Sequence, residues 1–375
     1  MPEGRFLEFF AGGGLARLGL GPHWRCVFAN EISEKKAAAY RLNFGPSPEL
    51  LVDDVRNVRA GSLPPADLAW GSFPCQDLSL AGNGLGFRGQ RSGTFWPFWD
   101  LAAGTATPIV VVENVVGAIT ANQGRDFDAI LAAFVDAGYW FGPLVIDAAR
   151  FVPQSRPRLF LVATRLDVPA ALRSPAPDPA WHGRALRDAW TRQPDRIRSR
   201  WIWWKLPEPE PRVSTFTGIV EDEALAPAWH TSEETARLLS MMSPANLDKV
   251  RHIRHERRRI AGTIYKRIRV EQGVKVQRAE VRFDQIGGCL RTPAGGSSRQ
   301  FVILVEGDSV RTRLLSPREA ARMMGADDYV LPANYNDAYH VMGDGLAVPA
   351  VSWIERLLLR PLLGIAPGRQ TPAAP

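Results

Sequence analysis

The chain has 375 residues and a formal net charge of +7, which favours a polyanionic partner such as nucleic acid. No stretch approaches the ~20 apolar residues that cross a membrane, and the N-terminus lacks the basic head and apolar core of a secretion signal. The three cysteines, Cys26, Cys75 and Cys289, are far apart, so we expect a reducing cytoplasmic setting with neither a disulfide framework nor a metal site.

The first elements have the pattern of a nucleotide-binding α/β unit. Residues 5–10 predict a buried strand, glycines 12–14 a tight turn, and a short helix follows. A second strand over 25–29 leads to Glu31, which follows the turn at the spacing of roughly 20 residues that suits an acid binding ribose hydroxyls. The turn alone is weak evidence. With Asp54 after a third predicted strand, a nucleoside-type cofactor becomes the better interpretation.

An apolar run at 69–73, followed by Pro74, places Cys75 at the end of another predicted strand. A doubly wound sheet carries its chemistry at such strand ends. The glycine-rich loop over 76–95 carries two arginines and can close over an anionic substrate. This pattern indicates a nucleophile, although a buried structural cysteine is the more common role for a lone thiol.

The apolar run 109–112 predicts a strand buried on both faces, and it ends at Glu113. The alternative for Glu113 is an acid at a helix N-terminus, because residues 116–121 could begin a helix. Further along, Arg156 and Arg158 lead into another buried strand. Two arginines there are costly to desolvate unless they meet acids or anions.

Beyond residue 166 the alternation of strands and helices stops. Residues 168–181 are rich in proline and alanine and predict a linker. The segment 198–205 interleaves aromatic and basic residues, and 251–269 is strongly basic. Both indicate a nucleic-acid footprint, with a solvated charged face as the alternative.

These segments, in this order, resemble the cytosine-5 DNA methyltransferase family over roughly 1–165 and 286–363. Two positions depart from the family pattern, since Glu8 stands for the usual Asp and Asp344 for the usual Asn. The matching motifs are Phe9-Phe10-Ala11-Gly12 with Gly14, Asn30-Glu31-Ile32, Asp54-Val55, Phe73-Pro74-Cys75-Gln76 with Ser79, Glu113-Asn114-Val115, Gln154-Ser155-Arg156-Pro157-Arg158, Arg313 to Glu319, and Gly343 to Pro349.

The resemblance implies an α/β fold: a doubly wound, Rossmann-like, S-adenosylmethionine-dependent methyltransferase domain with a smaller inserted target-recognition domain. In the last segment, Ser316 can cap a helix over 316–325, and a final helix is expected over 350–363. The expected parts are a catalytic domain at 1–166, a target-recognition domain at 167–285, a return segment at 286–363 and a disordered tail at 364–375.

By resemblance, Cys75 attacks carbon 6 of a flipped-out cytosine and Glu113 supplies a proton to nitrogen 3. Arg158, with Arg156, would bind the base carbonyl and brace the acid. S-adenosylmethionine is the implied cofactor, and its expected contacts are Phe10, Ala11, Gly12, Gly14, Glu31, Ile32, Asp54, Val55, Pro74, Phe95, Asp344 and Gly345. The expected DNA contacts are Gln76, Ser79, Arg88, Arg91, Arg254, Arg257 and Arg258.

The implied substrate is a specific sequence in double-stranded DNA, bound by a monomer that acts apart from any cognate restriction endonuclease. The expected setting is the cytoplasm, nucleoid-associated, of a bacterium or of a cell carrying the phage that encodes it. One alternative is a tRNA cytosine-5 methyltransferase, against which the large basic insertion argues. The other is a catalytically silent DNA-binding protein, against which the intact Cys75, Glu113 and Arg158 argue.

Overall fold

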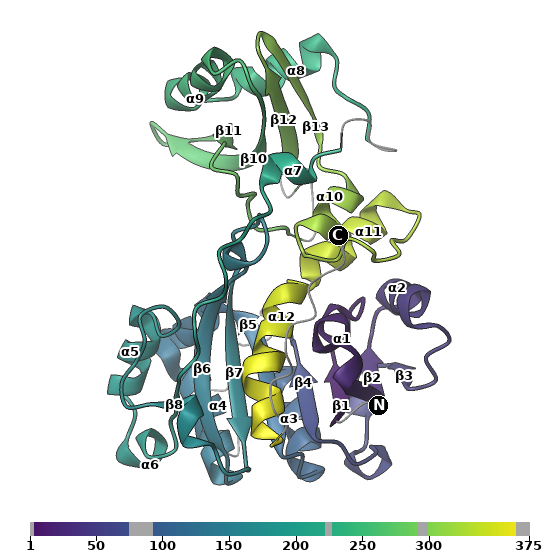
Figure 1. Cartoon of the computed structure of the whole chain (residues 1–375), viewed down its shortest axis with the longest axis vertical. Helices are drawn as coiled ribbons and strands as arrows, with labels where there is room; N and C mark the ends of the chain where they lie inside the picture. Colours follow the sequence, from purple (N-terminus) through teal and green to yellow (C-terminus); the bar gives the residue numbers. More distant parts are fainter. Residues whose placement is uncertain (1–3, 75–92, 222–226, 292–298, 365–375) are drawn as a thin grey trace.

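The computed structural model describes residues 4–74, 93–221, 227–291 and 299–364. Figure 1 shows two parts stacked along the long axis, a large α/β part that carries the N-terminus and a small part built on an antiparallel sheet. Between them lie α10 (Pro317–Arg322) and α11 (Tyr335–Asp344). Most of the expected lid loop and nearly all of the expected disordered tail fall outside the described residues.

The large part is organised on a seven-stranded sheet with the order β3-β2-β1-β4-β5-β7-β6. The first five strands pair in parallel, and β7 runs antiparallel to both of its neighbours. The order reverses between β1 and β4, where open α/β sheets bind their ligands, and the expected doubly wound fold is confirmed. The strands are β1 (Gly4–Phe9), β2 (Trp24–Glu31), β3 (Leu50–Val52), β4 (Leu68–Gly71), β5 (Ile109–Val115), β6 (Trp140–Asp147) and β7 (Pro157–Thr164).

Alternate residues of each strand feed two cores, one on each face of this sheet. Trp70 and Val111 pack into the core under α1, α2 and α12, whereas Ala69 and Val110 pack into the core under α3 and α4. The final helix expected over 350–363 is α12 continued by a π-helical turn and α13. The bounds are α1 (Leu15–Leu20), α2 (Glu34–Phe44), α3 (Phe95–Gly104), α4 (Arg125–Asp136), α12 (Val348–Ile354), the turn (Glu355–Leu359) and α13 (Arg360–Leu362).

The aromatic and basic segment 198–205 is part of the large core, so its prediction as a nucleic-acid footprint is wrong. Trp201, Trp203 and Trp204 are buried. The indole of Trp204 donates a hydrogen bond to the Gly142 carbonyl (2.8 Å) on β6. The pattern misled because aromatic residues that pack on a sheet edge look, in sequence, like residues that stack on bases. The neighbouring elements are β8 (Arg173–Ser174), α5 (Arg184–Thr191), α6 (Asp195–Arg198) and β9 (Trp203–Trp204).

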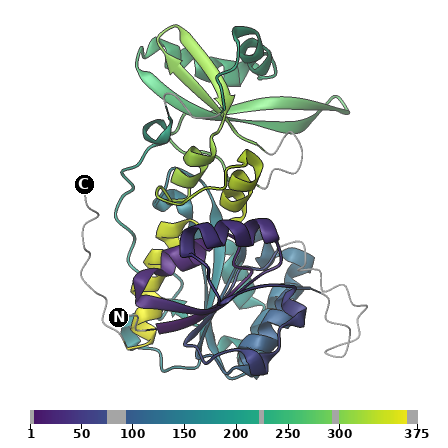
Figure 2. The same ribbon diagram turned by 90° about the vertical axis from the view of Figure 1, so that its right-hand side faces the viewer.

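The small part is a four-stranded antiparallel sheet with the order β11-β10-β12-β13. One face carries Ile303 and Val305 and packs against α8 and α9. The other face carries Val302 and Leu304 and packs against α7, α10 and α11. Figure 2 shows the β10–β11 hairpin projecting from this sheet. The bounds are α7 (Phe216–Ile219), α8 (Ser232–Ser240), α9 (Pro244–His255), β10 (Arg259–Glu271), β11 (Val274–Arg282), β12 (Phe301–Glu306) and β13 (Ser309–Leu314).

The helices and strands therefore divide between the large and the small part at points other than the expected domain boundaries at 167 and 285. Residues up to Trp204 pack on the large sheet, while β12 and β13, which were expected in the return segment, complete the small one. We propose residues 216–314 as the smaller domain. The sequence lacked a signal for this boundary because a sheet is assembled from strands that are distant in sequence.

Two local expectations also change. The helix that could begin at 116–121 is a pair of 3-10 helices, and Glu113 lies within β5 rather than at a helix N-terminus. The capping box at Ser316 and Glu319 is confirmed, but α10 ends at Arg322. Within the described ranges, no helix is long and apolar enough to cross a membrane, and no cluster of three or more potential ligands could hold a metal.

Candidate active site

Glu113 lies near the carboxyl end of β5, with only 7% of its surface exposed. Its Oε1 atom lies 3.2 Å from Nε of Arg158, at the start of the adjacent strand β7. Burial raises the pKa of the Glu113 carboxyl, and the charges of Arg158 and Arg156 oppose that shift. A carboxyl held in this way is a candidate proton donor, as expected from the sequence.

Asn114, the next residue, ties β5 to the strand end that leads to Cys75. Its side-chain amide donates a hydrogen bond to the Phe73 carbonyl (3.0 Å), and its Oδ1 accepts one from the Val115 amide (2.8 Å). Cys75 itself lies outside the described residues, and the exposed Pro74 is the last described residue before it. The expected site residues omitted Asn114, although its place directly after Glu113 could have signalled that it helps to position this strand end.

The two arginines expected to act together both approach Cys289 but differ in their other partners. Arg158 remains beside Glu113, and its terminal nitrogens donate to the Pro157 carbonyl and approach Sγ of Cys289. Arg156 is 2% exposed, and both of its terminal nitrogens are occupied. They donate to Sγ of Cys289 and to the carbonyls of Leu290, Gly343 and Gly345.

A direct contact between Arg156 and a substrate base is therefore a wrong prediction, since these donors already have protein acceptors. Burial lowers the pKa of Arg156 to about 10, which leaves the guanidinium charged at neutral pH. Arg156 instead links the start of β7 to the segment around Gly343 through hydrogen bonds to its carbonyls. The motif spacing could not distinguish these roles, because residues two apart along a strand point to the same face, so the different partners of the two arginines depend on tertiary packing.

The glycine turn after β1 is closed by Glu31. Oε2 of Glu31 accepts a hydrogen bond from the Gly12 amide (2.8 Å), and Oε1 accepts one from the Ser33 amide (2.8 Å). Phe10 and Gly14 adopt left-handed backbone angles, with φ of 58° and 79°, which shape the turn. A Cβ added to Gly12 would meet no atom within 4 Å, so space lies open in front of this residue. Ala11 completes the turn, its amide donating to the Asn30 carbonyl.

The remaining expected cofactor contacts surround this turn in different environments. Ile32 is 66% exposed, so its apolar side chain is accessible to a ligand. The Asp54 carboxylate accepts hydrogen bonds from Arg56, which lower its pKa. By contrast, Val55 and Phe95 are buried, and Phe95 packs against Phe73. For Val55 and Phe95 the structure leaves little side-chain surface for a ligand.

A family model of the C-5 cytosine-specific DNA methylase matches residues 4–359. The chain belongs to this family. The type II methyltransferase M.MspI of Moraxella sp is 33% identical over 162 residues, which are 42% of this chain and 38% of that protein. M.HpaII of Haemophilus parainfluenzae is 25% identical over 379 residues, which are 95% of this chain and 89% of that protein. Other curated relatives also match over about half of their length or less.

The fold of this methylase-family chain is also that of solved structures. A variant of Spodoptera frugiperda DNMT2 aligns with a TM-score of 0.58 at 16% identity, covering 96% of this chain and 99% of that one. Dnmt2 of S. pombe aligns with a TM-score of 0.57 at 17% identity, with the same coverage. At these identities the likeness concerns the fold.

The two departures from the family pattern have partners of their own. Asp344 ends α11 and forms an ion pair with Lys36 of α2 (2.7 Å), a residue that the sequence did not point to. Glu8 is 1% exposed and accepts hydrogen bonds from the Arg17 amide and the Tyr40 hydroxyl. Burial raises the pKa of Glu8 to about 8. Gly345, next to Asp344, takes part through its carbonyl, which accepts from Arg156.

The expected DNA contacts that fall within the described ranges do not gather around Glu113. Gln76, Ser79, Arg88 and Arg91 lie outside the described residues. Arg254, Arg257 and Arg258 lie on α9 or just after it. This helix covers the face of the small sheet that is turned away from the large part, so these three arginines are distant from Glu113 in the fold.

Proposed function

We propose that this chain is a DNA (cytosine-5-)-methyltransferase that transfers a methyl group from S-adenosylmethionine to duplex DNA. The observation that carries the proposal is the buried pair Glu113–Arg158, beside the strand end that Asn114 holds at Phe73, just before Cys75. A thiol and a proton donor on neighbouring strand ends suit attack on a pyrimidine ring. The names of the curated relatives, type II methyltransferases, support the same activity.

Carbon 5 of cytosine is a poor nucleophile, so the ring must be activated before it can accept a methyl group. The Cys75 thiolate forms a bond to carbon 6, while Glu113 donates a proton to nitrogen 3, which makes carbon 5 electron-rich. Bound S-adenosylmethionine supplies the electrophilic methyl group that carbon 5 takes. Loss of the carbon 5 proton to a base then breaks the bond to sulfur and releases Cys75 as thiolate, and the nitrogen 3 proton returns to Glu113.

Glu113 must carry a proton at neutral pH to act as this donor. Its burial favours the neutral acid, and the Arg158 guanidinium limits the shift so that the proton can still leave. Arg158 also keeps the carboxyl in one orientation. The positive charge near the ring carbonyl would help to stabilise the electron density that builds up during attack.

The residues around the glycine turn fit the nucleoside part of S-adenosylmethionine. Each Glu31 oxygen accepts one backbone hydrogen bond and keeps a second lone pair, which a ribose hydroxyl can use. The open space at Gly12 allows a ligand to approach the backbone. Ile32, exposed beside Glu31, would cover one face of the adenine ring.

Duplex DNA is the proposed partner, with residues 216–314 as the domain that selects the sequence. The net charge of +7 favours a polyanion, and the small sheet stands above the large part that carries Glu113. A base inside a duplex is out of reach of a thiol, so the target cytosine must leave the stack.

A trapping experiment with DNA that carries 5-fluorocytosine tests the proposal. Fluorine cannot leave carbon 5 as a proton does, so Cys75 should remain covalently attached to the DNA after methyl transfer. Cys75→Ala should form no adduct, which a denaturing gel would show.

Two matched cysteine variants serve as controls. Cys26 is buried, and burial raises its pKa to about 12, so its thiol stays protonated; Cys26→Ala should still trap. Cys289 touches Arg156 and is the other thiol near the site, so Cys289→Ser is the sharper control. Adduct formation by Cys75→Ala, or its loss only in Cys289→Ser, would contradict the assignment.

A further inference from the structure

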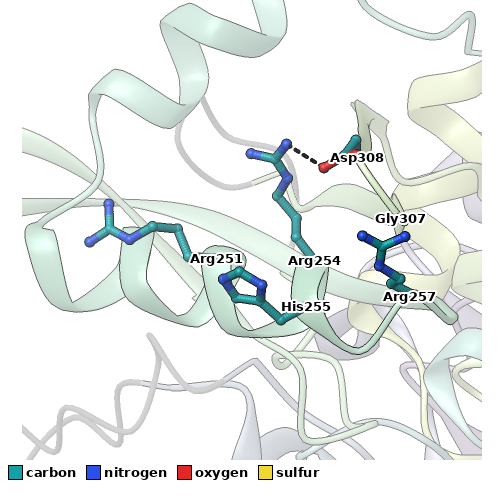
Figure 3. Close-up of a pocket in the computed structure, with 6 residues that line it drawn as sticks. All are labelled: Arg251, Arg254, His255, Arg257, Gly307 and Asp308. Carbon is teal, nitrogen blue, oxygen red and sulfur yellow. Dashed lines mark hydrogen bonds and ion pairs between the residues drawn. The ribbon is translucent and has the colours of Figure 1, made fainter.

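A basic pocket of about 320 Å³ opens where the C-terminal end of α9 meets the turn between β12 and β13. We call it the outer basic pocket. Figure 3 shows the Arg254 side chain reaching toward this turn, with Arg257 beside it. Its lining residues are Arg251, Arg254, His255, Arg257, Gly307 and Asp308.

The pocket lies on the side of the small domain that is turned away from the candidate active site. Val250 and Ile253 of α9 pack with Ile303 and Val305 on one face of the sheet. The opposite face, with Val302, packs toward α10 and α11 and so toward the large part. DNA that presents its cytosine to Glu113 therefore approaches from the other side of the small domain.

The charges of the pocket are held only by exposed contacts. Arg254 pairs with Asp308 at 3.0 Å, but the Asp308 side chain is 94% exposed. Arg251 pairs with Asp248 of its own helix, and among the described residues no side-chain partner is found for Arg257. Exposed pairs of this kind contribute little, so an incoming anion can replace Asp308 at small cost. Guanidinium groups bind phosphate through two parallel hydrogen bonds.

The backbone around the pocket holds these side chains at defined positions. Arg257 has a left-handed φ of 49° directly after α9, and Gly307 has a φ of 55° in the facing turn. The Arg257 amide donates to the Arg254 carbonyl, which closes the end of the helix. Arg254 and Arg257 thus lie beside the same turn, whereas Arg251 points away from it.

The lining also indicates what the pocket would bind. It contains three arginines and one histidine but no apolar wall and no Phe, Tyr or Trp on which a base could stack. A free nucleotide would therefore find no such ring on which to stack its base. A phosphodiester backbone needs only the cationic groups that are present.

We propose that the outer basic pocket binds backbone phosphates of the DNA, on a stretch outside the one that meets Glu113. This inference rests on the proposed function and deepens it. Arg254 and Arg257 contact phosphate and do not read bases. DNA that extends beyond the recognition site gains affinity and a steeper salt dependence through this second contact.

The test compares two DNA lengths, each containing the same recognised site. One duplex spans about one helical turn, ~10 base pairs, and the other about four turns, ~40 base pairs. The variant Arg254→Gln/Arg257→Asn removes two charges, and asparagine tolerates the left-handed angle at position 257. The matched control Arg184→Gln/Arg187→Asn removes two charges from exposed residues of α5, on the large part. Thermal unfolding establishes that both variants fold.

For the long duplex, the slope of log affinity against log salt should fall by about 1 per arginine, so by roughly 2, with a severalfold loss of affinity. For the one-turn duplex, the slopes of variant and parent should coincide. The control should keep the parent slope with both lengths.

Equal losses with both lengths would place these arginines at the main recognition surface and overturn the proposal. No loss with either length would overturn it as well. Pyrophosphate binding that depends on Arg254 and Arg257, without an effect of DNA length, would assign the pocket to a free anion and reject DNA. Methyl transfer by the unaltered chain to the one-turn duplex tests the proposed function separately.

Discussion

Charged residues are held in opposite ways at the strand ends of the large sheet and on the outer side of the small domain. At the strand ends, Glu8, Glu113 and Arg156 are almost completely buried, and each has defined hydrogen-bond or ion-pair partners. On the outer side, Arg254 is exposed and pairs with Asp308, which is itself on the surface.

The difference follows from the cost of taking a charge out of water. A buried charge is tolerated only with good geometry, so its position is fixed and its loss leaves other groups unsatisfied. An exposed charge is screened, and it can exchange its partner for a phosphate. Chemistry that needs precision is thus expected in the first region, and adjustable binding to a polyanion in the second.

The largest effect is expected from Glu113→Gln. The amide keeps the shape of the side chain but cannot donate a proton to nitrogen 3, so methyl transfer should fall by about 10²- to 10⁴-fold. In the parent, activity should decline as pH rises and the Glu113 acid ionises, a dependence that the variant should lack. Assays of tritiated methyl transfer over roughly pH 6 to 9 measure both the rate and its pH dependence. Glu306→Gln, at an exposed end of β12, is the matched control. Full activity of Glu113→Gln would remove the acid from the mechanism.

A large loss of stability is expected from Arg156→Ala, since the buried carbonyls of Leu290 and Gly343 and the partly buried carbonyl of Gly345 would lose their donor. Leaving such groups unsatisfied should lower the free energy of unfolding by about 3–5 kcal/mol. Arg269→Ala, which breaks a half-exposed pair with Glu280, should cost only about 0–1 kcal/mol. Urea denaturation measures both. Similarly small losses of unfolding free energy in both variants would mean that the hydrogen bonds of Arg156 do not stabilise the fold.

A pH-dependent effect on stability is expected from Glu8→Gln. The pKa of Glu8 is raised from 4.5 to about 8 by burial, so the folded chain holds a proton that the unfolded chain releases between these values. Stability should therefore fall as pH rises from about 4.5 to 8, by at most ~1.4 kcal/mol per pH unit from this group. The variant should be less sensitive over this interval in urea denaturation. Identical pH profiles for parent and variant would show that Glu8 ionises normally.

Much of the large part could be predicted from local patterns. The buried strands at 5–10 and 109–112, the turn at Gly12 and the helix capped by Ser316 depend on apolar periodicity and on residues that suit one backbone geometry. The likeness of ordered motifs also pointed to Glu113 and Arg158 as neighbours, and they form an ion pair.

The sequence by itself therefore determined the order of the elements, the family and the residue types of the candidate site. Only the tertiary structure decided which charges are buried and on which side of the small sheet each arginine lies. It gave Arg156 its carbonyl partners and left Arg158 beside Glu113. It also placed Trp204 in a core and turned α9 away from Glu113. These outcomes depend on packing between segments distant in the chain, and local residue patterns do not encode which surfaces exclude water.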